Sequence, residues 1–273
     1  MTTAKCAIAL LLFTTTTGLT SAQSSTAQYR VTFDVTWSNA THPGAYPGGA
    51  HFSPLVGGVH NQNASLWEPG GIATNGIEIM AETGATSVLR SEVNSHIAAG
   101  NALEIVTGPG AGAPDQVTTT FEANSNMSLL TLVTMIAPSP DWFVGTHGLD
   151  LRDDDGWISE IVYQLDPYDA GTDSGINFTS PNADITPHDP ISNLSAVPPF
   201  AGTPTLGTFT ITLISVETCL PDVNGDGQLT ATDFTAWINA FNNNLPACDQ
   251  NNDGSCTPTD FTAWITNFNS GCP

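Results

Sequence analysis

Residues 29–37 read YRVTFDVTW and residues 208–214 read TFTITLI, and both stretches alternate apolar with polar side chains. A period of two is the pattern of a strand with one buried face, so both stretches are predicted to be β-strands. Residues 127–136 and 157–165 are also of β type, and stretches rich in Gly, Pro and Asn separate the four segments. The chain therefore carries several short strands joined by turns.

A helical segment is expected from Gly76 to Glu82, with an extension through Ser87–Ala99. Few long helices and many short strands are typical of an antiparallel β-sandwich. We therefore expect a mainly β fold, with an antiparallel β-sandwich over residues 29–216 whose two ends both lie in sheets. The acidic run Asp153–Asp155 is interpreted as a solvated loop.

The charge balance excludes several classes of function. Lys and Arg number 4 against 26 Asp and Glu, so the formal net charge is −22. A basic surface for nucleic acid cannot be built from so few cations, and electrostatic docking on anionic lipid is disfavoured. The hydrophobic fraction of 40% excludes the composition of a disordered chain. Such an excess of carboxylates instead calls for bound cations.

The N-terminus has the layout of a secretory signal peptide over residues 1–22. Lys5 precedes the apolar run Cys6–Phe13, and small residues lie before a cleavage point after Ala22. The apolar run is too short to cross a bilayer, and the sequence has no second such stretch. We expect a secreted, extracellular protein without a membrane span.

Four cysteines remain after that cleavage, at positions 219, 248, 256 and 272. In a secreted chain an even number of cysteines indicates disulfides, and four allow three pairings. We favour Cys219–Cys272, which joins the two ends of a small C-terminal module over residues 219–273, with Cys248–Cys256 as a local bridge. Zinc binding is disfavoured, because no pair has the usual short spacing and no histidine lies nearby.

An internal repeat is the strongest signal in the sequence. Residues 222–241, DVNGDGQLTATDFTAWINAF, recur as residues 249–268, DQNNDGSCTPTDFTAWITNF. Each copy begins with a twelve-residue loop in which oxygen-bearing residues alternate and glycine occupies position 6. This is the EF-hand scheme for Ca²⁺. The predicted ligands are Asp222, Asn224, Asp226, Gln228 and Asp233 in the first loop, and Asp249, Asn251, Asp253, Ser255 and Asp260 in the second. Position 9, Thr230 or Thr257, is expected to hold a water.

Each loop is followed by apolar residues at helical spacing. Phe234, Trp237, Ile238 and Phe241 form one set, and Phe261, Trp264, Ile265 and Phe268 form the other. Spacings of three and four residues predict two short amphipathic helices that bury these faces against each other. The module has a small core, so ions and disulfides are expected to contribute much of its stability.

A duplicated loop–helix unit with Asp at loop position 12 resembles a dockerin. The resemblance covers residues 219–273, and the Gly271-Cys272-Pro273 ending with the DFTAWI helices is similar to dockerin-like tails of planctomycete-type secreted proteins. It implies two calcium ions and a docking role toward a cohesin-like receptor. The pair that contacts cohesin in cellulosomal dockerins is here Ala231-Thr232 in one copy and Pro258-Thr259 in the other, which departs from the usual pattern.

A second resemblance rests on a series of short strings in the large domain. In chain order they are HFSPL (51–55), GGVH (57–60), LWEPG (66–70), AETG (81–84), SPDWFVG (139–145), DPYDAGTDSG (166–175) and FTSPN (178–182). Together they resemble the spondin N-terminal domain of F-spondin-like extracellular proteins over residues 29–200. The most specific strings are SPDWFVG and DPYDAGTDSG.

Those two strings also carry three aspartates suited to a hard cation. Asp169 and Asp173 flank a tight turn, and Asp141 lies on a loop stiffened by Pro140. Three carboxylates and a backbone carbonyl, near Leu165, would make an oxygen-rich site. The resemblance implies that these residues bind calcium, so we expect one ion in the sandwich besides the two in the tail.

No sequence pattern of a known catalytic centre is present, because HExxH, GxSxG and a Cys/His pairing are all missing. We therefore predict a non-enzymatic, calcium-binding adhesion or surface-attachment protein. Its sandwich would bind a protein or glycan partner at the cell surface or matrix. The alternative is a hydrolase or carbohydrate-binding component of an extracellular assembly that the dockerin-like tail recruits.

Overall fold

The first and last strands of the sandwich pair with each other in the computed structural model, which describes residues 25–154 and 156–272. β1 (Ser25–Val35) runs antiparallel to β14 (Gly207–Thr218) along its whole length. β6 (Asp115–Asn124) flanks β1 and β11 (Glu160–Gln164) flanks β14, which gives a four-stranded sheet. The predicted strands at both ends of the domain are confirmed, since alternate residues of β1 are buried.

The second sheet is built around β7 (Leu129–Ala137), which is buried along almost its whole length. One edge of β7 pairs with β8 (Trp142–Asp150), and the other pairs with β2 (His51–Phe52) and β3 (Val56–His60). The remaining strands are β4 (Ala102–Thr107) and β5 (Ala111–Gly112), beyond β3 and β2, and β12 (Tyr168–Asp169) and β13 (Ser192–Asn193), beyond β8.

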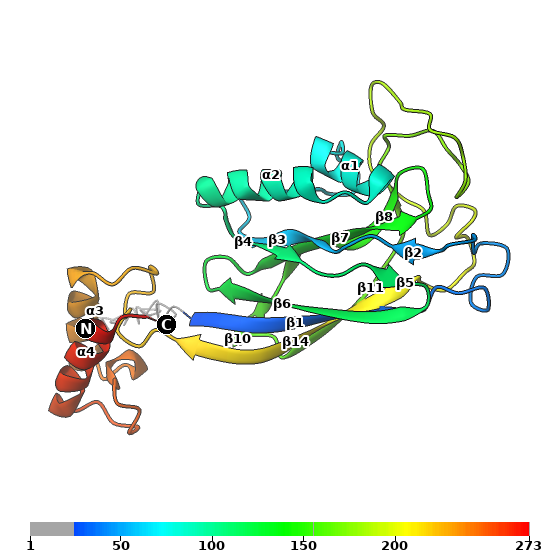
Figure 1. Ribbon diagram of the computed structural model, residues 1–273. Helices are drawn as coiled ribbons and strands as arrows, with labels where there is room; N and C mark the ends of the chain where they lie inside the picture. The colour runs from blue at the N-terminus through cyan, green and yellow to red at the C-terminus, as the bar shows by residue number, and fades with distance from the viewer. Residues whose placement is uncertain (1–24, 155, 273) are drawn as a thin grey trace, which may run out of the picture. The chain divides into compact units, whose positions relative to one another are not determined.

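Two helices form a third layer of the domain. The sequence predicted helix in this region but not that it would form a layer. Figure 1 shows α1 (Asn75–Thr83) and α2 (Ser87–Ala98) over the face of the second sheet that is turned away from the first sheet. One apolar core lies between the sheets and includes Phe33, Phe52 and Phe209. A second core lies between the helices and the second sheet. The expected helical segment is thus two helices, and Gly84, with φ of 71°, ends the first.

Two of the strings that carry the spondin resemblance lie in strands that no alternation predicted. Residues 57–60 lie in β3, and SPDWFVG enters β8 at Trp142. The first five residues of β8 and all of β3 are buried, because the second sheet is covered on both faces. A strand buried on both faces has no alternation of apolar and polar residues, so the period-two pattern misses it.

A short hairpin of β9 (Arg152–Asp153) and β10 (Gly156–Trp157) carries the acidic run. Asp153 and Asp154 are exposed, in agreement with a solvated loop, and Asp155 lies outside the described residues. The predicted signal peptide, residues 1–22, also lies outside them. In the part of the chain that the structure describes, no helix is long and apolar enough to span a membrane.

The tail forms a compact unit of its own, and the division between the two units falls between Cys219 and Leu220. It contains α3 (Ala231–Asn242), a single turn of 3-10 helix η1 (Pro246–Cys248) and α4 (Pro258–Ser270). The favoured disulfides, Cys219–Cys272 and Cys248–Cys256, are both present.

Aromatic side chains of the two tail helices pack against each other as predicted. The ring centroids of Phe234 and Trp264 are 5.2 Å apart, and those of Trp237 and Phe261 are 5.5 Å apart. The isoleucines were predicted to share this core, and that prediction is wrong: Ile238 is 41% exposed and Ile265 is 40% exposed. Trp237 and Trp264 are buried in the core of the tail, whereas one ring, Phe261, is 39% exposed and remains on the surface with the isoleucines.

Gly57 should be indispensable to the second sheet. A Cβ at this position would lie 1.9 Å from the Thr131 carbonyl oxygen of β7, whereas a Cβ at Gly48 would meet nothing within 4 Å. We expect Gly57→Ala to lower the free energy of unfolding by about 3 kcal/mol or more, because a backbone oxygen cannot move aside without breaking the β3–β7 ladder. Gly48→Ala is the control, and urea unfolding of both variants measures the difference. Equal stabilities would contradict the packing of β3 against β7.

Candidate metal centres

The first tail loop wraps backbone N–H groups around the carboxylate at loop position 1. Asp222 is fully buried, and its Oδ1 accepts hydrogen bonds from the N–H groups of Gly225 and Asp226 at 2.9 and 3.2 Å. Its Oδ2 accepts from the N–H of Gly227 at 2.9 Å. Gly225 and Gly227 have φ of 71° and 79°, a conformation that glycine adopts without strain. The turn at loop position 6 is therefore formed as the EF-hand scheme requires.

The second loop repeats this arrangement. Asp249 Oδ1 accepts from the N–H of Asp253 at 3.1 Å, and its Oδ2 accepts from the N–H of Gly254 at 2.8 Å. Position 4 here is Asn252, which has φ of 57°, and asparagine tolerates this left-handed conformation better than most residues. In both loops the position-3 amide donates to the position-5 carboxylate at 3.0 Å. The two copies of the repeat thus fold alike.

The last acid of each loop joins the loop to the helix that follows. Asp233 and Asp260 are fully buried, and each accepts hydrogen bonds from backbone N–H groups of its own loop. Thr230 caps α3 and forms a capping box with Asp233. Burial raises the pKa of Asp260, but hydrogen bonds from Thr257, Gln250 and Asn251 outweigh burial and hold that pKa below its ordinary value. This carboxylate is therefore charged over the physiological range.

The oxygens of these loops form an incomplete cage by themselves. Within the described residues, no three His, Cys, Asp or Glu side chains already converge closely enough to hold a metal. The loops offer asparagine side chains and backbone carbonyls besides carboxylates, and Ca²⁺ accepts such mixed oxygen donors.

The pairing of β8 with β12 brings the segments that carry the three aspartates of the sandwich next to one another, although within the described residues no three acidic side chains converge closely enough to hold a metal. Asp169 lies opposite Trp142 in this pairing, and Asp141 directly precedes β8. The Asp141 carbonyl accepts from the N–H of Ala170 at 3.1 Å, which fixes the turn that leads to Asp173. The structure thus places two strings that are distant in the sequence, 139–145 and 166–175, side by side. Leu165, near which a carbonyl ligand was expected, is buried in the core between the sheets.

Asp141 is the most unusual of the three. Its side chain is fully buried, and Oδ2 accepts from the N–H groups of Thr172 and Asp173 at 2.8 and 3.1 Å. The Thr172 hydroxyl lies 3.3 Å from the same oxygen. Oδ1 is buried and has no hydrogen-bond partner. Burial, together with the nearby charge of Asp169, raises the pKa of Asp141 to about 6, although the hydrogen bonds lower it. A buried acceptor without a donor is costly, and a bound cation would relieve that cost.

Asp169 and Asp173 are held in place by hydrogen bonds to both of their oxygens. Asp169 accepts from the N–H of Gly171 at 2.8 Å and from the Trp142 indole at 3.2 Å. Asp173 accepts from the N–H groups of Gly175 and Ala183, each at 2.6 Å. Burial also raises the pKa of Asp169. The carboxylates are thus oriented before any ion binds.

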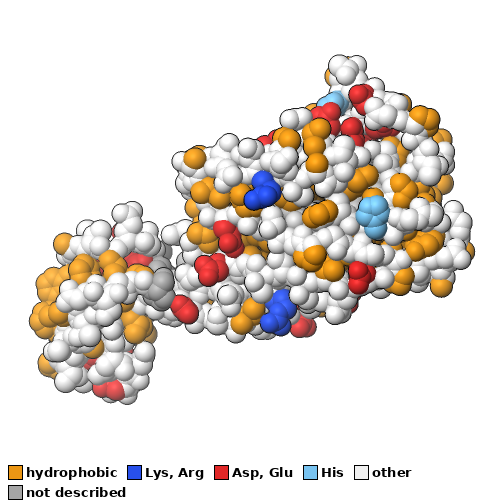
Figure 2. All heavy atoms as spheres, viewed as in Figure 1, with side chains coloured by type: hydrophobic (Ala, Val, Ile, Leu, Met, Phe, Trp, Pro, Cys, Tyr) orange, Lys and Arg blue, Asp and Glu red, His pale blue; other side chains and the backbone are white. Residues whose placement is uncertain are grey.

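Further acids surround these three. Figure 2 shows acidic side chains and a histidine gathered at the end of the sandwich that carries the loop after β12, drawn yellow-green in Figure 1. His188 Nε2 lies 3.9 Å from Glu78 Oε1. Thr172 was not predicted to belong to this site; it lies between Asp169 and Asp173 and hydrogen-bonds to Asp141. Its position inside the string DPYDAGTDSG was the one available signal.

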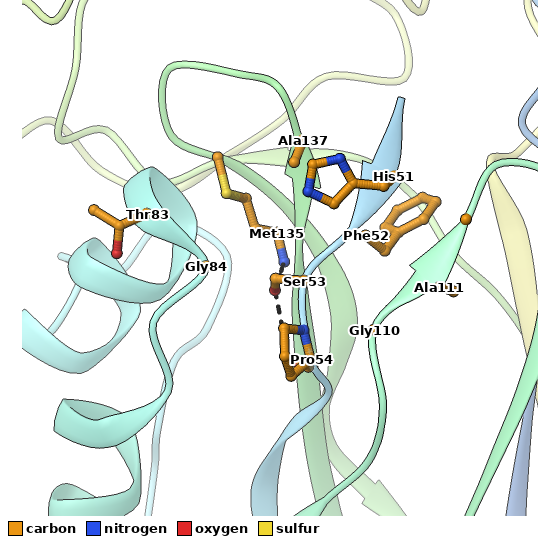
Figure 3. A pocket seen from close by; sticks show the side chains of 11 residues that line it. His51, Phe52, Ser53, Pro54, Thr83, Gly84, Gly110, Ala111, Met135 and Ala137 are labelled. Atoms are coloured by element: carbon orange, nitrogen blue, oxygen red, sulfur yellow. Dashed lines mark hydrogen bonds between the residues drawn. The ribbon is translucent and has the colours of Figure 1, made fainter. Parts of the chain in front are cut away.

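A separate pocket of about 600 Å³ opens between the end of α1 and strands β2, β5 and β7 (Figure 3). Its lining is mostly apolar side chains and glycine backbone, and His51 is its one titratable residue. The imidazole Nδ1 is hydrogen-bonded to the Gly49 carbonyl at 2.8 Å. Ser53 is buried and accepts from the N–H of Met135 at 2.9 Å. This lining suits an apolar contact surface and contains no activated nucleophile.

The Spondin_N family matches residues 27–203, which is more than half of the chain. The chain belongs to the Spondin_N family. A second match, to the dockerin type I domain, covers residues 220–269. The spondin and dockerin resemblances of the two parts are therefore confirmed.

Two relatives illustrate the extent of the match. The spondin domain is 37% identical over 181 residues to spondin-2 of Homo sapiens, covering 63% of this chain and 54% of that protein. It is 36% identical over 181 residues to spondin-1 of Mus musculus, covering 63% of this chain and 22% of that protein. The chain therefore matches only part of each relative. Dockerin type I domains bind calcium, which supports calcium as the ion of the tail.

The raised pKa of Asp141 has a consequence for stability without calcium. A carboxyl with a raised pKa holds its proton more tightly in the folded domain than in the unfolded chain. The contribution of Asp141 to the stability of the fold is therefore greatest below the pKa of the unfolded chain, and it is lost as the pH rises through about 6. Asp141→Asn mimics the protonated group at every pH. In EDTA, we expect its stability relative to wild type to increase from about pH 4 to pH 7, by up to ~3 kcal/mol. Urea unfolding across this range measures it, and a difference independent of pH would contradict the burial of an ionised Asp141.

Proposed function

We propose that this protein is a secreted, calcium-binding, non-enzymatic adhesion or surface-attachment protein. Its spondin domain binds an extracellular protein or glycan, and its dockerin tail attaches it to a cohesin-like receptor or to the cell surface. One observation carries the proposal: the same chain contains a spondin domain and a dockerin unit. The spondin domain has a buried carboxylate oxygen without a hydrogen-bond donor, and the dockerin unit has two ordered acidic loops.

The spondin domain would hold one calcium ion through Asp141, Asp169 and Asp173. The donorless Oδ1 of Asp141 supports this assignment, because a hard cation satisfies a buried carboxylate oxygen that no N–H reaches. Backbone and indole donors fix the orientation of the other two carboxylates. Bound calcium would tie the turn after β12 to the start of β8 and so stiffen this end of the domain.

The tail would hold two more ions, one in each loop. Loop positions 9 and 12 belong to the helix caps as well as to the predicted ligand sets, as Thr230 and Asp233 show. Ion binding would therefore stabilise the first turn of each helix and, through it, the small aromatic core. Because structure and ion are coupled in this way, the docking surface would exist only in the calcium-loaded tail.

Exposed apolar residues on the tail helices support a docking role. Ile238 and Ile265 occupy equivalent positions of the two copies and are exposed to the same extent, 41% and 40%, and Phe261 is 39% exposed. A contiguous exposed apolar patch marks an interaction site, and these side chains would contribute to one on the tail. The pairs Ala231-Thr232 and Pro258-Thr259 differ between the copies, so a partner would distinguish one helix from the other.

The pocket supports binding more than catalysis. Its single titratable residue, His51, has no acid or nucleophile arranged beside it, and the Ser53 hydroxyl is committed to backbone and Thr134. The alternative function, a hydrolase or carbohydrate-binding component recruited by the dockerin, draws on the same pocket, which is large enough for a sugar or a side chain.

One set of assays separates these functions. The full chain is applied to immobilised extracellular-matrix proteins and to a glycan array in calcium and again in EDTA, and it is incubated with a panel of polysaccharides. We expect calcium-dependent binding to a matrix or glycan target and no release of reducing sugar. The non-enzymatic function would be contradicted if the wild type released sugar and if removal of calcium or Asp141→Asn abolished that release. Binding that is insensitive to EDTA would contradict the role of calcium.

A further inference from the structure

Each tail helix is hydrogen-bonded to the loop of the other copy of the repeat. The Trp237 indole of α3, in the first copy, donates to the Cys248 carbonyl at 3.2 Å. The Trp264 indole of α4, in the second copy, donates to the Pro221 carbonyl at 3.3 Å. Cys248 and Pro221 occupy equivalent places, because each directly precedes position 1 of a loop. The two hydrogen bonds are therefore reciprocal.

These hydrogen bonds act on the first predicted ligand of each loop. Both are buried, and the side chains of Trp237 and Trp264 are only 5% and 6% exposed. A carbonyl group and the N–H of the following residue lie in one rigid peptide plane. Fixing the carbonyl therefore fixes the backbone from which the position-1 carboxylate, Asp222 or Asp249, extends.

The same tryptophans are also connected to the last acid of the loop that precedes their own helix. Asp233, position 12 of the first loop, and Trp237 are four residues apart on α3. Asp260, position 12 of the second loop, and Trp264 are four residues apart on α4. Side chains at this spacing lie on one face of a helix, one turn apart. An ion held at position 12 would therefore order the turn that aims the tryptophan at the opposite loop.

Gln250 adds a further contact between the copies. It is position 2 of the second loop and is 2% exposed, and its side-chain amide donates to the Leu220 carbonyl at 2.7 Å, next to Pro221. The backbone carbonyl of Gln250 accepts from the Asn267 amide of α4 at 2.9 Å. The start of the first loop is thus held by two groups of the second copy.

We propose that Trp237 and Trp264 are positioning residues of the calcium sites of the tail, each for the loop of the other copy, and that the two sites consequently bind calcium cooperatively. This inference rests on the calcium sites proposed for the tail. Asp233 and Trp237 connect the first site to the second loop. Asp260 and Trp264 connect the second site to the first loop, with the help of Gln250. The docking surface would then form over a narrow range of calcium concentration.

Substitution of each tryptophan by phenylalanine tests this inference, because phenylalanine keeps an aromatic ring and lacks the N–H. Trp237→Phe and Trp264→Phe are matched controls for each other, since they make the same change at equivalent positions. Each is introduced into chains with one working tail loop, in which Asp222→Ala disables the first loop or Asp249→Ala disables the second. Every chain also carries Asp141→Asn, which removes the site proposed for the spondin domain. Calorimetric titration of the full chain measures calcium affinity.

The expected effects cross from one copy to the other. Trp237→Phe should weaken calcium binding about fivefold or more where only the second loop works, and less than about twofold where only the first loop works. Trp264→Phe should do the reverse. With both loops intact and both tryptophans present, we expect a Hill coefficient above one, and binding about fivefold or more weaker when either loop is disabled.

A variant outside the aromatic core keeps the test decisive if a tryptophan substitution unfolds the tail, which circular dichroism in saturating calcium reports. Gln250→Met removes the amide that donates to the Leu220 carbonyl and leaves the rings in place. In the chain that carries Asp249→Ala, it should weaken the first loop although it lies in the second. An unchanged affinity of the first loop would overturn the inference.

The remaining outcomes distinguish this inference from the function on which it rests. Equal weakening of both loops by either tryptophan substitution would overturn it, because the rings would then serve only the core. Weakening confined to the loop that precedes the substituted helix would overturn it too. Independent binding, in which disabling one loop leaves the affinity of the other unchanged, would remove the coupling and leave the two tail sites standing. A tail that binds no calcium would refute both the proposed sites and the inference.

Discussion

Carboxylates in this chain are held by backbone N–H groups rather than by basic side chains, and the rest of the structure depends on that constraint. Lys and Arg number 4 against 26 acids, so ion pairs cannot compensate the buried aspartates. Asp141, Asp222, Asp233 and Asp260 are fully buried and accept hydrogen bonds from the backbone instead. Such donors orient a carboxylate but carry only partial charges, so net negative charge accumulates in each turn. Bound divalent cations would neutralise it, and at Asp141 a proton would do so at lower pH.

The same constraint connects the metal centres to the folding of each unit. In the tail, Asp233 is at once a predicted ligand, an acceptor for Thr230 and the third residue of α3, so a bound ion and the helix start would stabilise each other. In the spondin domain, the β8–β12 pairing and the hydrogen bonds of Thr172 bring Asp141 to the turn that carries Asp173. Calcium would therefore act on local order at the ends of elements, while the two apolar cores hold the sheets.

The sequence predicted what periodicity and repetition encode. The alternation in residues 29–37 and 208–214 predicted β1 and β14, and the repeat predicted both tail helices. The number and positions of the cysteines predicted the two disulfides. β3 and β8 escaped because strands covered on both faces show no alternation. The exposure of Ile238 depends on how the aromatic rings of the tail helices pack, and no local sequence pattern reports that. The ligand sets themselves stay predictions.

A count of calcium ions bound per chain tests the central claim most directly. Native mass spectrometry of the full chain, dialysed against calcium and then freed of excess ion, gives this number without any assumption about function. The structure leads us to expect three ions, two in the loops of the tail and one in the spondin domain. A count of two calcium ions would contradict the proposed centre around Asp141. A chain that retains its fold with no bound calcium would contradict the account of how its carboxylates are neutralised.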